Sequence, residues 1–316
     1  MVFGVLTVVM GGLCALYAPL MLLSQLAAAR VNPSLVNPAA IVPAIATYAA
    51  LGVALIWLGI GSIQARRWAR ALLLIFSWSW LLVGILSVII TAFIMPKMLS
   101  MFSGAGTAHP EPLSSAIVAG IMIMTFLILG FVFVLAPTAW VCFYGSRHVK
   151  ATCEARDGVT RWTDACPLPV LALCLWLAYS VPTLLLMPLM GRGVFPCFGT
   201  FVTGAPGTML SLAVAILWGY VAWLLYRLDL RGWWLLLATS IVFTISAIVT
   251  FARHDVMEMY ELMGYPQGQL DQLRQLGLLS GSRMVWLLVV GPVPFLGYLL
   301  FVRRYFPARS QVPRHA

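Results

Sequence analysis

The run ALLLIFSWSWLLVGILSVIITAFIMP, residues 71–96, contains no ionisable side chain and directly follows the basic turn ARRWAR at residues 65–70. A helix of about 20 apolar residues crosses a bilayer, so this run is long enough to span a membrane. A helix is expected because a backbone in lipid must satisfy its own hydrogen bonds. The stretch therefore predicts a transmembrane helix that begins just after a cluster of arginines.

The same pattern recurs along the whole chain. The other long runs without Asp, Glu, Lys or Arg are 2–29, 31–65, 112–146, 165–191, 193–226, 232–252 and 284–302. Hydrophobic residues make up 62% of the chain and charged residues 9%, whereas a soluble domain has roughly 25% charged residues. The sequence thus predicts an all-α, polytopic integral membrane protein with eight transmembrane helices.

The basic residues predict which way the helices run through the membrane. With the N-terminus in the cytoplasm, most of the 19 Lys and Arg residues are cytoplasmic: Arg66, Arg67, Arg70, Arg147, Lys150, Arg156, Arg161, Arg227, Arg231, Arg303, Arg304, Arg309 and Arg314. The positive-inside rule then places both termini in the cytoplasm, and we expect a multi-pass protein of a bacterial inner membrane. The net charge of +10 matches a lipid bilayer as partner, and no nucleic acid is expected.

Two similar turns indicate an internal repeat. Setting Arg66 and Trp68 of IQARRWARALLL (63–74) on Arg231 and Trp233 of LDLRGWWLLLA (228–238) gives an offset of 165 residues. An even number of helices in each copy makes the two copies parallel. The predicted organisation is a first four-helix repeat at 1–147, a cytoplasmic inter-repeat loop at 148–166, a second four-helix repeat at 167–306 and a basic tail at 307–316.

Hydroxyl-bearing and small residues inside the predicted helices have two interpretations. At the offset of 165, Ser79 meets Thr244, and the two are candidates for a polar path at the repeat interface. The alternative is hydrogen bonding between packed helices, for which small residues allow close approach. The pairs Gly11 with Ala15 and Ala50 with Ala54 fit such packing.

Weak candidates for a metal site lie on the predicted outer side. Met95, Met98 and Met101 recur every third residue, and His254 and Glu258 stand one helical turn apart in the second repeat. Thioether and imidazole ligands would suit Cu(I), but methionine is also a common packing residue at the rim of a membrane helix. The surrounding segment, 253–283, is predicted to form one or two short amphipathic helices, and no cofactor is expected.

The stretch HVKATCEARDGVTRWTDACPLP, residues 148–169, is the most polar part of the chain. Its Cys153 and Cys166 lack the close CxxC spacing of structural zinc sites, and cytoplasmic thiols normally stay reduced. A structured connector is the simplest interpretation. Its polarity also makes it a candidate docking surface for a cytoplasmic protein partner, formed by Arg156, Asp157, Arg161 and Asp164.

The function is constrained mainly by what the sequence lacks. It contains no common catalytic motif, and the predicted helices carry no ionisable group of the kind that ion-coupled transporters use as relays. We therefore expect a non-enzymatic membrane subunit, scaffold or sensor. The alternatives are a passive or weakly coupled transporter of a small solute with a path between the repeats, and copper handling at the outer face.

Overall fold

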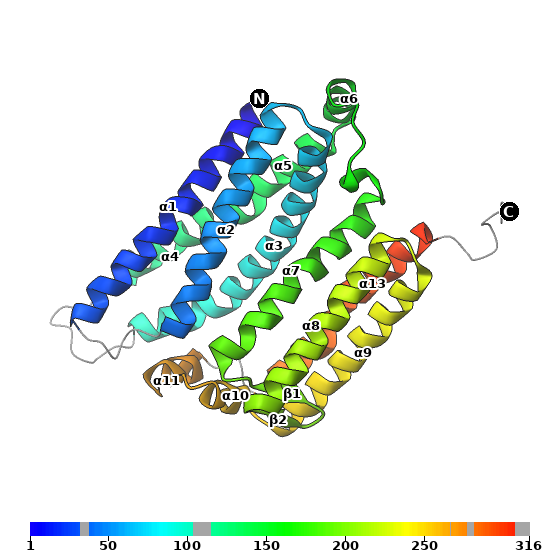
Figure 1. The fold of residues 1–316 in the computed structure, drawn as a ribbon. Coiled ribbons are helices and arrows are strands. Elements are labelled where there is room, and N and C mark those ends of the chain that lie inside the picture. The colour runs from blue at the N-terminus through cyan, green and yellow to red at the C-terminus, as the bar shows by residue number, and fades with distance from the viewer. Residues whose placement is uncertain (32–37, 104–114, 266, 277–280, 307–316) are drawn as a thin grey trace. The chain divides into compact units, whose positions relative to one another are not determined.

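The computed structural model describes residues 1–31, 38–103, 115–265, 267–276 and 281–306. This part of the chain is almost entirely helical (Figure 1). It contains eight helical segments long and apolar enough to cross a membrane, at Val2–Ala27, Ala44–Ile63, Arg67–Met95, Ala119–Gly145, Leu168–Pro188, Gly204–Tyr226, Leu230–Arg253 and Met284–Tyr305. The prediction of eight spans from charge-free runs is confirmed.

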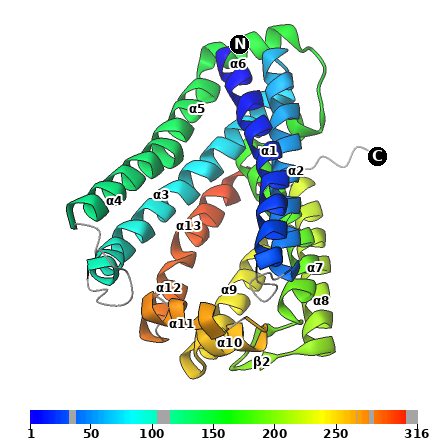
Figure 2. The same cartoon turned by 90° about the vertical axis from the view of Figure 1, so that its left-hand side faces the viewer.

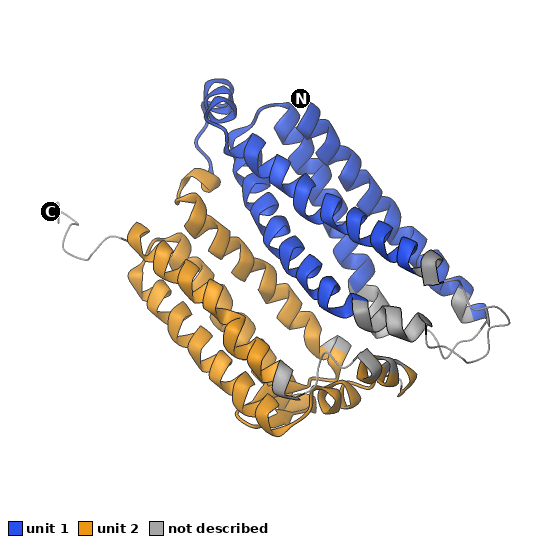
Figure 3. Cartoon of the chain, turned by 180° about the vertical axis from the view of Figure 1, so that it is seen from behind, with its two compact units in different colours: residues 1–161 blue, residues 162–316 orange. Residues whose placement is uncertain are grey.

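The chain forms two compact units, residues 1–161 and 162–316, each with four of these spans (Figure 3). Unit 1 contains α1 (Val2–Val31), α2 (Pro38–Ile63), α3 (Arg67–Ser103), α4 (Ser115–Gly130), the π-helix η2 (Phe131–Leu135), α5 (Ala136–Gly145) and α6 (Arg147–Arg156). Unit 2 contains η3 (Trp162–Asp164), α7 (Leu168–Gly191), β1 (Phe195–Cys197), β2 (Thr200–Val202), α8 (Gly204–Tyr226), α9 (Leu230–Arg253), α10 (Val256–Leu262), α11 (Gln267–Leu276), α12 (Gly281–Val290), α13 (Pro292–Val302) and η4 (Arg303–Tyr305).

In unit 1, α1 and α2 lie side by side with their backbones in contact (Figure 1). A Cβ atom added to Gly11 would lie 2.7 Å from the backbone nitrogen of Ile56, and one added to Gly52 would lie 2.8 Å from that of Ala15. Small residues are required at these positions because any larger side chain would separate the two helices. The prediction for Gly11 and Ala15 is confirmed. That for Ala50 and Ala54 is wrong, since both are exposed.

Aromatic side chains fix α5, which Figure 2 shows in unit 1, against the first three helices of that unit. The indole Nε1 of Trp140 donates to Thr7 Oγ1 at 3.2 Å, and the hydroxyls of Ser62 and Tyr144 lie 2.7 Å apart. Both bonds link residues distant in sequence and leave the buried polar groups with partners. This end of unit 1 is therefore a well-packed core.

The fourth span of each unit is interrupted near its middle. In unit 1 the N–H of Ala136 donates to Phe131 O across the π-helix, and Pro137, which has no N–H, follows at once. The carbonyl of Phe133 loses its helical donor and lies against Gly84 of α3, where an added Cβ would lie 2.0 Å from it. In unit 2 the interruption falls at Gly291, between α12 and α13, before Pro292.

The turn between the second and third spans has the same hydrogen bonds in both units. In unit 1, Ala65 has φ 55°, and the N–H of Arg66 donates to Gly61 O at 2.9 Å. In unit 2, Leu228 has φ 56°, and the N–H of Asp229 donates to Leu224 O at 3.0 Å. Each is a Schellman motif with a residue other than glycine in the left-handed position.

Candidate functional site

The polar segment at 147–169 is divided between the two units. Its first part forms α6, at the end of unit 1 where α5 ends (Figure 2). The side chain of Ser146 caps this helix by accepting the N–H of Val149 at 3.3 Å. Val149, Cys153 and Asp157 follow one another at intervals of four residues and form the inward stripe of α6, with Cys153 and Asp157 buried.

Within this segment, the buried carboxylate of Asp157 makes both a hydrogen bond and an ion pair to another part of unit 1. Its side chain is 1% exposed, accepts the backbone N–H of Arg67 at 3.2 Å and faces the guanidinium of Arg66 at 3.7 Å. It therefore caps the first turn of α3 from 90 residues further along the chain. Of the four candidate docking residues, Arg156, Arg161 and Asp164 are exposed and Asp157 faces inward.

The second part of the segment is anchored to unit 2. The hydroxyl of Tyr226 donates to Trp162 O and that of Tyr298 donates to Pro169 O, both at 2.9 Å. Thr163 and Cys166, in the same part of the segment, are buried. Residues 158–161, all exposed, remain as the short connection between the two anchored parts.

The two cysteines of the segment are unsuited to nucleophilic chemistry at neutral pH. Burial raises the pKa of the Cys166 thiol to about 11. Burial also raises the pKa of Cys153, and the nearby guanidinium of Arg70 only partly offsets this. A thiol must lose its proton to attack an electrophile or bind a metal. In the part of the chain that the structure describes, no three His, Cys, Asp or Glu side chains converge on a metal site.

At the other end of unit 2, the β1–β2 hairpin is fixed to α9. Its turn residues Phe198 and Gly199 have φ 40° and 92°, as in a type I′ turn. The N–H of Phe198 donates to Ser246 Oγ at 3.0 Å, and the N–H of Gly199 donates to Thr250 Oγ1 at 2.9 Å. These two buried hydroxyls of α9 therefore hold the hairpin in place.

The candidate path residues also make local contacts. Thr244 is half-buried, and its hydroxyl donates to Ser240 O within α9 at 2.8 Å. Ser79 is half-buried in α3 and also takes part in an interaction. A hydroxyl bound to the carbonyl four residues earlier is satisfied within its own helix.

His254 and Glu258 come together as the sequence suggested. Nδ1 of His254 lies 2.9 Å from Glu258 Oε2, and its Nε2 lies 3.1 Å from Gly199 O. Both ring nitrogens thus face an oxygen atom, which connects α9, α10 and the hairpin. Of the methionine candidates, Met95 is half-buried at the end of its span. The side chains of Met98 and Met101 lie outside the described residues.

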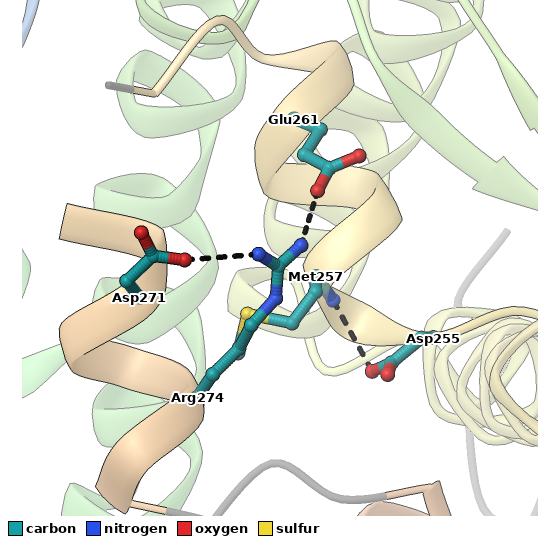
Figure 4. A network of polar contacts seen from close by, with 5 residues as sticks. All are labelled: Asp255, Met257, Glu261, Asp271 and Arg274. Carbon is teal, nitrogen blue, oxygen red and sulfur yellow. Dashed lines mark hydrogen bonds and ion pairs between the residues drawn. The ribbon is translucent and has the colours of Figure 1, made fainter. Parts of the chain in front are cut away.

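Charged residues lock α10 and α11 together (Figure 4). The guanidinium of Arg274 on α11 binds Glu261 of α10 and, at 3.1 Å, Asp271 of its own helix. Asp255 caps α10 by accepting the N–H of Met257 at 3.3 Å. The two helices correspond to the predicted amphipathic segment, and their buried apolar residues, which include Leu270, face protein.

Every acidic side chain in the described part of the chain takes part in an interaction. Only Glu111, of the 9 Asp and Glu residues, lies outside that part. The interacting residues are Glu154, Asp157, Asp164, Asp229, Asp255, Glu258, Glu261 and Asp271. Seven of these side chains, all except Asp164, form helix caps or ion pairs.

No family model, curated protein or solved structure matches the chain.

Proposed function

We propose that the chain is a non-enzymatic, multi-pass membrane protein that serves as a subunit, scaffold or sensor within a larger membrane assembly. The use of seven of the eight described carboxylates in helix caps and ion pairs is the observation that carries this proposal. A general acid, general base or proton relay needs a titratable group placed to exchange its proton with a substrate or ion. Those seven carboxylates instead support helix ends and connections.

Arg156, Arg161 and Asp164 are the proposed docking residues. Arg156 and Arg161 are exposed in unit 1, where Asp157 anchors the first part of the 147–169 segment. Asp164 is exposed in unit 2, where the hydroxyls of Tyr226 and Tyr298 anchor the second part. The partner we expect is a membrane or cytoplasmic protein.

The test is co-purification of the tagged full chain in a mild detergent, with the mass measured by light scattering. We expect a complex heavier than the 34.6 kDa chain, containing a second protein in fixed ratio. The triple substitution Arg156→Ser, Arg161→Ser and Asp164→Ser should release that protein. Arg147→Ser, at an exposed position outside the surface, is the matched control and should retain it. A lone monomer for the unsubstituted chain would contradict the proposal.

We also propose that the two units are parallel repeats with both termini in the cytoplasm. The shared turn geometry supports this and favours an offset of 163, which pairs Ala65 with Leu228, over the offset of 165 inferred from the Arg-x-Trp motifs. At 163, Ser77 meets Ser240, and each donates to the carbonyl four residues earlier. Cysteine labelling of the two termini from either side of sealed vesicles tests the topology. Labelling from opposite sides would contradict it.

A passive or weakly coupled transporter of a small solute is the second candidate. It is favoured by the interruption of both fourth spans, because transporters build midplane sites from broken helices in corresponding positions of two repeats. Solute uptake into proteoliposomes tests it. Uptake that falls in Ser79→Ala and Thr244→Val, at constant protein content, would support a path past these residues, and unchanged uptake would reject that path.

Copper handling is the third candidate, with two separate clusters: the His254–Glu258 pair in unit 2, and Met95, Met98 and Met101 in unit 1. The contact between His254 and Glu258 supports only a two-ligand fragment of a site. Metal analysis of the full chain made in copper-replete cells tests it. Protein without stoichiometric copper would remove this candidate.

A further inference from the structure

Three arginines at one end of unit 2 lie over aromatic rings. The guanidinium carbon of Arg227 is 4.0 Å from the centre of the Trp223 ring, and that of Arg304 is 3.8 Å from the centre of the Phe301 ring. The guanidinium carbon of Arg303 lies 5.3 Å and 5.6 Å from the ring centres of Trp233 and Trp234. We call these seven residues the arginine–aromatic end.

One ring of this end is held by the fold. The indole N–H of Trp233 donates to Leu299 O at 2.8 Å, which ties α9 to α13. A Cβ atom on Gly232 would lie 2.7 Å from Leu224 Cβ, so the last turn of α8 and the first turn of α9 are in contact. Trp233 therefore gives Arg303 a fixed neighbour, whereas the rings of Trp223 and Phe301, beside Arg227 and Arg304, are 46% and 44% exposed.

The arginine–aromatic end stands where candidate membrane spans of unit 2 begin and end. Arg227 follows the span Gly204–Tyr226 directly, and Arg303 and Arg304 close the span Met284–Tyr305. Aromatic residues such as Trp223 and Trp234, both about half exposed, favour the boundary between hydrocarbon and water. The arginines and rings at these span ends therefore have the position and the chemistry that favour the boundary between hydrocarbon and water.

The charge of this end is not neutralised within the described residues. None of the ion pairs found there includes Arg227, Arg303 or Arg304. The nearby carboxylate of Asp229 accepts the N–H of Arg231 as a helix cap. In unit 1, by contrast, the buried carboxylate of Asp157 faces Arg66. Unit 2 therefore keeps a cationic surface at a position where unit 1 carries an internal counter-charge.

We propose that the arginine–aromatic end binds the phosphate groups of anionic phospholipids. A guanidinium stacked on a ring keeps N–H groups along its edge available, and these match two phosphate oxygens in a bidentate contact. In Arg304 one of these groups, at Nη2, already donates to the hydroxyl of Tyr305 at 2.8 Å. The negative surface potential of such lipids adds attraction for each basic residue near the surface. The inference depends on the membrane spans and is independent of the proposed subunit role.

The test uses the purified full chain in detergent, titrated with phosphatidylglycerol or with phosphatidylcholine, and counts retained lipids by native mass spectrometry. We expect phosphatidylglycerol to be retained preferentially. The triple substitution Arg227→Gln, Arg303→Gln and Arg304→Gln should weaken its binding roughly tenfold or more. The triple substitution Arg147→Gln, Arg192→Gln and Arg253→Gln removes the same charge from exposed positions elsewhere and should leave the preference in place.

A lysine triple at the same three positions separates stacked guanidinium recognition from charge alone. Lysine keeps the charge but lacks the planar fork, so binding should fall between that of the unsubstituted chain and that of the glutamine triple. If the glutamine triple fails to fold, the lysine triple and Arg227→Gln carry the test by the same loss of preference. Lysine binding equal to that of the unsubstituted chain would overturn the recognition by stacked arginines.

Three further outcomes would also overturn the proposal. One is equal retention of the two lipids by the unsubstituted chain, which would leave an acidic protein as the partner of this surface. Another is an equal loss in the charge-matched control. The third is displacement of phosphatidylglycerol by inorganic phosphate at equal concentration, which would identify free phosphate as the ligand.

Discussion

The α2–α3 turn of unit 1 and the α8–α9 turn of unit 2 have the same backbone conformation with different residues in it. In unit 1 the helix before the turn carries Gly61 and the helix after it carries Ala69; a Cβ on Gly61 would lie 2.8 Å from Ala69 Cβ. In unit 2 the order is reversed, with Leu224 before the turn and Gly232 after it. The close contact is kept while the small residue changes sides.

The caps of the following helices differ in the same way. Asp229 is adjacent in sequence to α9 and accepts the N–H of Arg231 at 2.9 Å, whereas α3 receives its cap from Asp157 of the distant α6 segment. Each turn therefore requires a small residue where its two helices touch and a carboxylate oxygen that accepts a backbone N–H of the following helix. The chain supplies both from different positions in the two units. Substitutions that exchange or remove these elements test this view.

The largest loss of stability is expected for Gly61→Leu. A leucine at Gly61 would overlap Ala69 and the ring of Trp68, so the free energy of unfolding should fall by about 3 kcal/mol. Unfolding by sodium dodecyl sulfate in mixed micelles measures it. Gly12→Leu, at a glycine with open space around it, is the matched control and should have little effect.

The reversed order in unit 2 also predicts a coupling between the two positions. Adding Ala69→Gly to Gly61→Leu reproduces the arrangement of Leu224 and Gly232 and should restore part of the lost stability, measured as a double-mutant cycle. If the effects of the two substitutions on stability were strictly additive, the small residue could not be moved from one side of the turn to the other.

The second-largest loss of stability is expected for Asp157→Ala. The substitution removes the cap of α3, worth about 1 kcal/mol, and an ion pair with the partly exposed Arg66, worth up to about 1 kcal/mol. The free energy of unfolding should therefore fall by about 2 kcal/mol. Asp157→Asn keeps an acceptor for the Arg67 N–H and should lose about half as much. A loss in Glu154→Ala as large as in Asp157→Ala would mean that the cap is not the cause.

A smaller effect is expected for Asp229→Ala. This cap is local and solvent-accessible, so its removal should cost about 1 kcal/mol in the same unfolding measurement. Asp229→Asn should be close to the unsubstituted protein, because asparagine caps helices as well as aspartate does. A loss of unfolding free energy equal to that of Asp157→Ala would show that the local cap and the distant cap contribute equally to stability.

The smallest effect at neutral pH concerns Cys166, in the part of the 147–169 segment that belongs to unit 2. Its pKa is raised from the ordinary value of 9.0 to about 11. The unfolded chain therefore loses this proton first, and stability should fall as pH rises from 9 toward 11, with no contribution at pH 7. The difference in unfolding free energy between the unsubstituted chain and Cys166→Ala isolates this change. A difference that stays flat up to pH 11 would rule it out.

The membrane architecture could be predicted from sequence because it depends on a local property. A charge-free run such as 71–96 needs no knowledge of its neighbours to be identified as a span, and the helix Arg67–Met95 contains most of it. The contact between His254 and Glu258 was also predictable, because the two residues are only four positions apart, although the helix breaks between them, where α9 ends and α10 begins.

The parts that could not be predicted depend on contacts distant in sequence. Asp157 was predicted to be a docking residue because it stands among other charged residues in the most polar segment, and only the fold brings it to the first turn of α3. Ser246 and Thr250 are among the hydroxyl-bearing residues of the predicted helices, and their partners are backbone amides of a hairpin that lies before α8 in the chain. No periodicity records such pairs.

The docking of the hairpin on α9 has a consequence for the order in which the protein is made. Ser246 and Thr250 lie 48 and 51 residues beyond the turn amides they bind. At about 5–20 residues per second, a ribosome needs roughly 2–10 s to supply them after the turn itself has emerged. During that interval water must satisfy the amides of Phe198 and Gly199, so the hairpin stays on the aqueous side while α8 enters the bilayer. The arrival of α9 then fixes it in place.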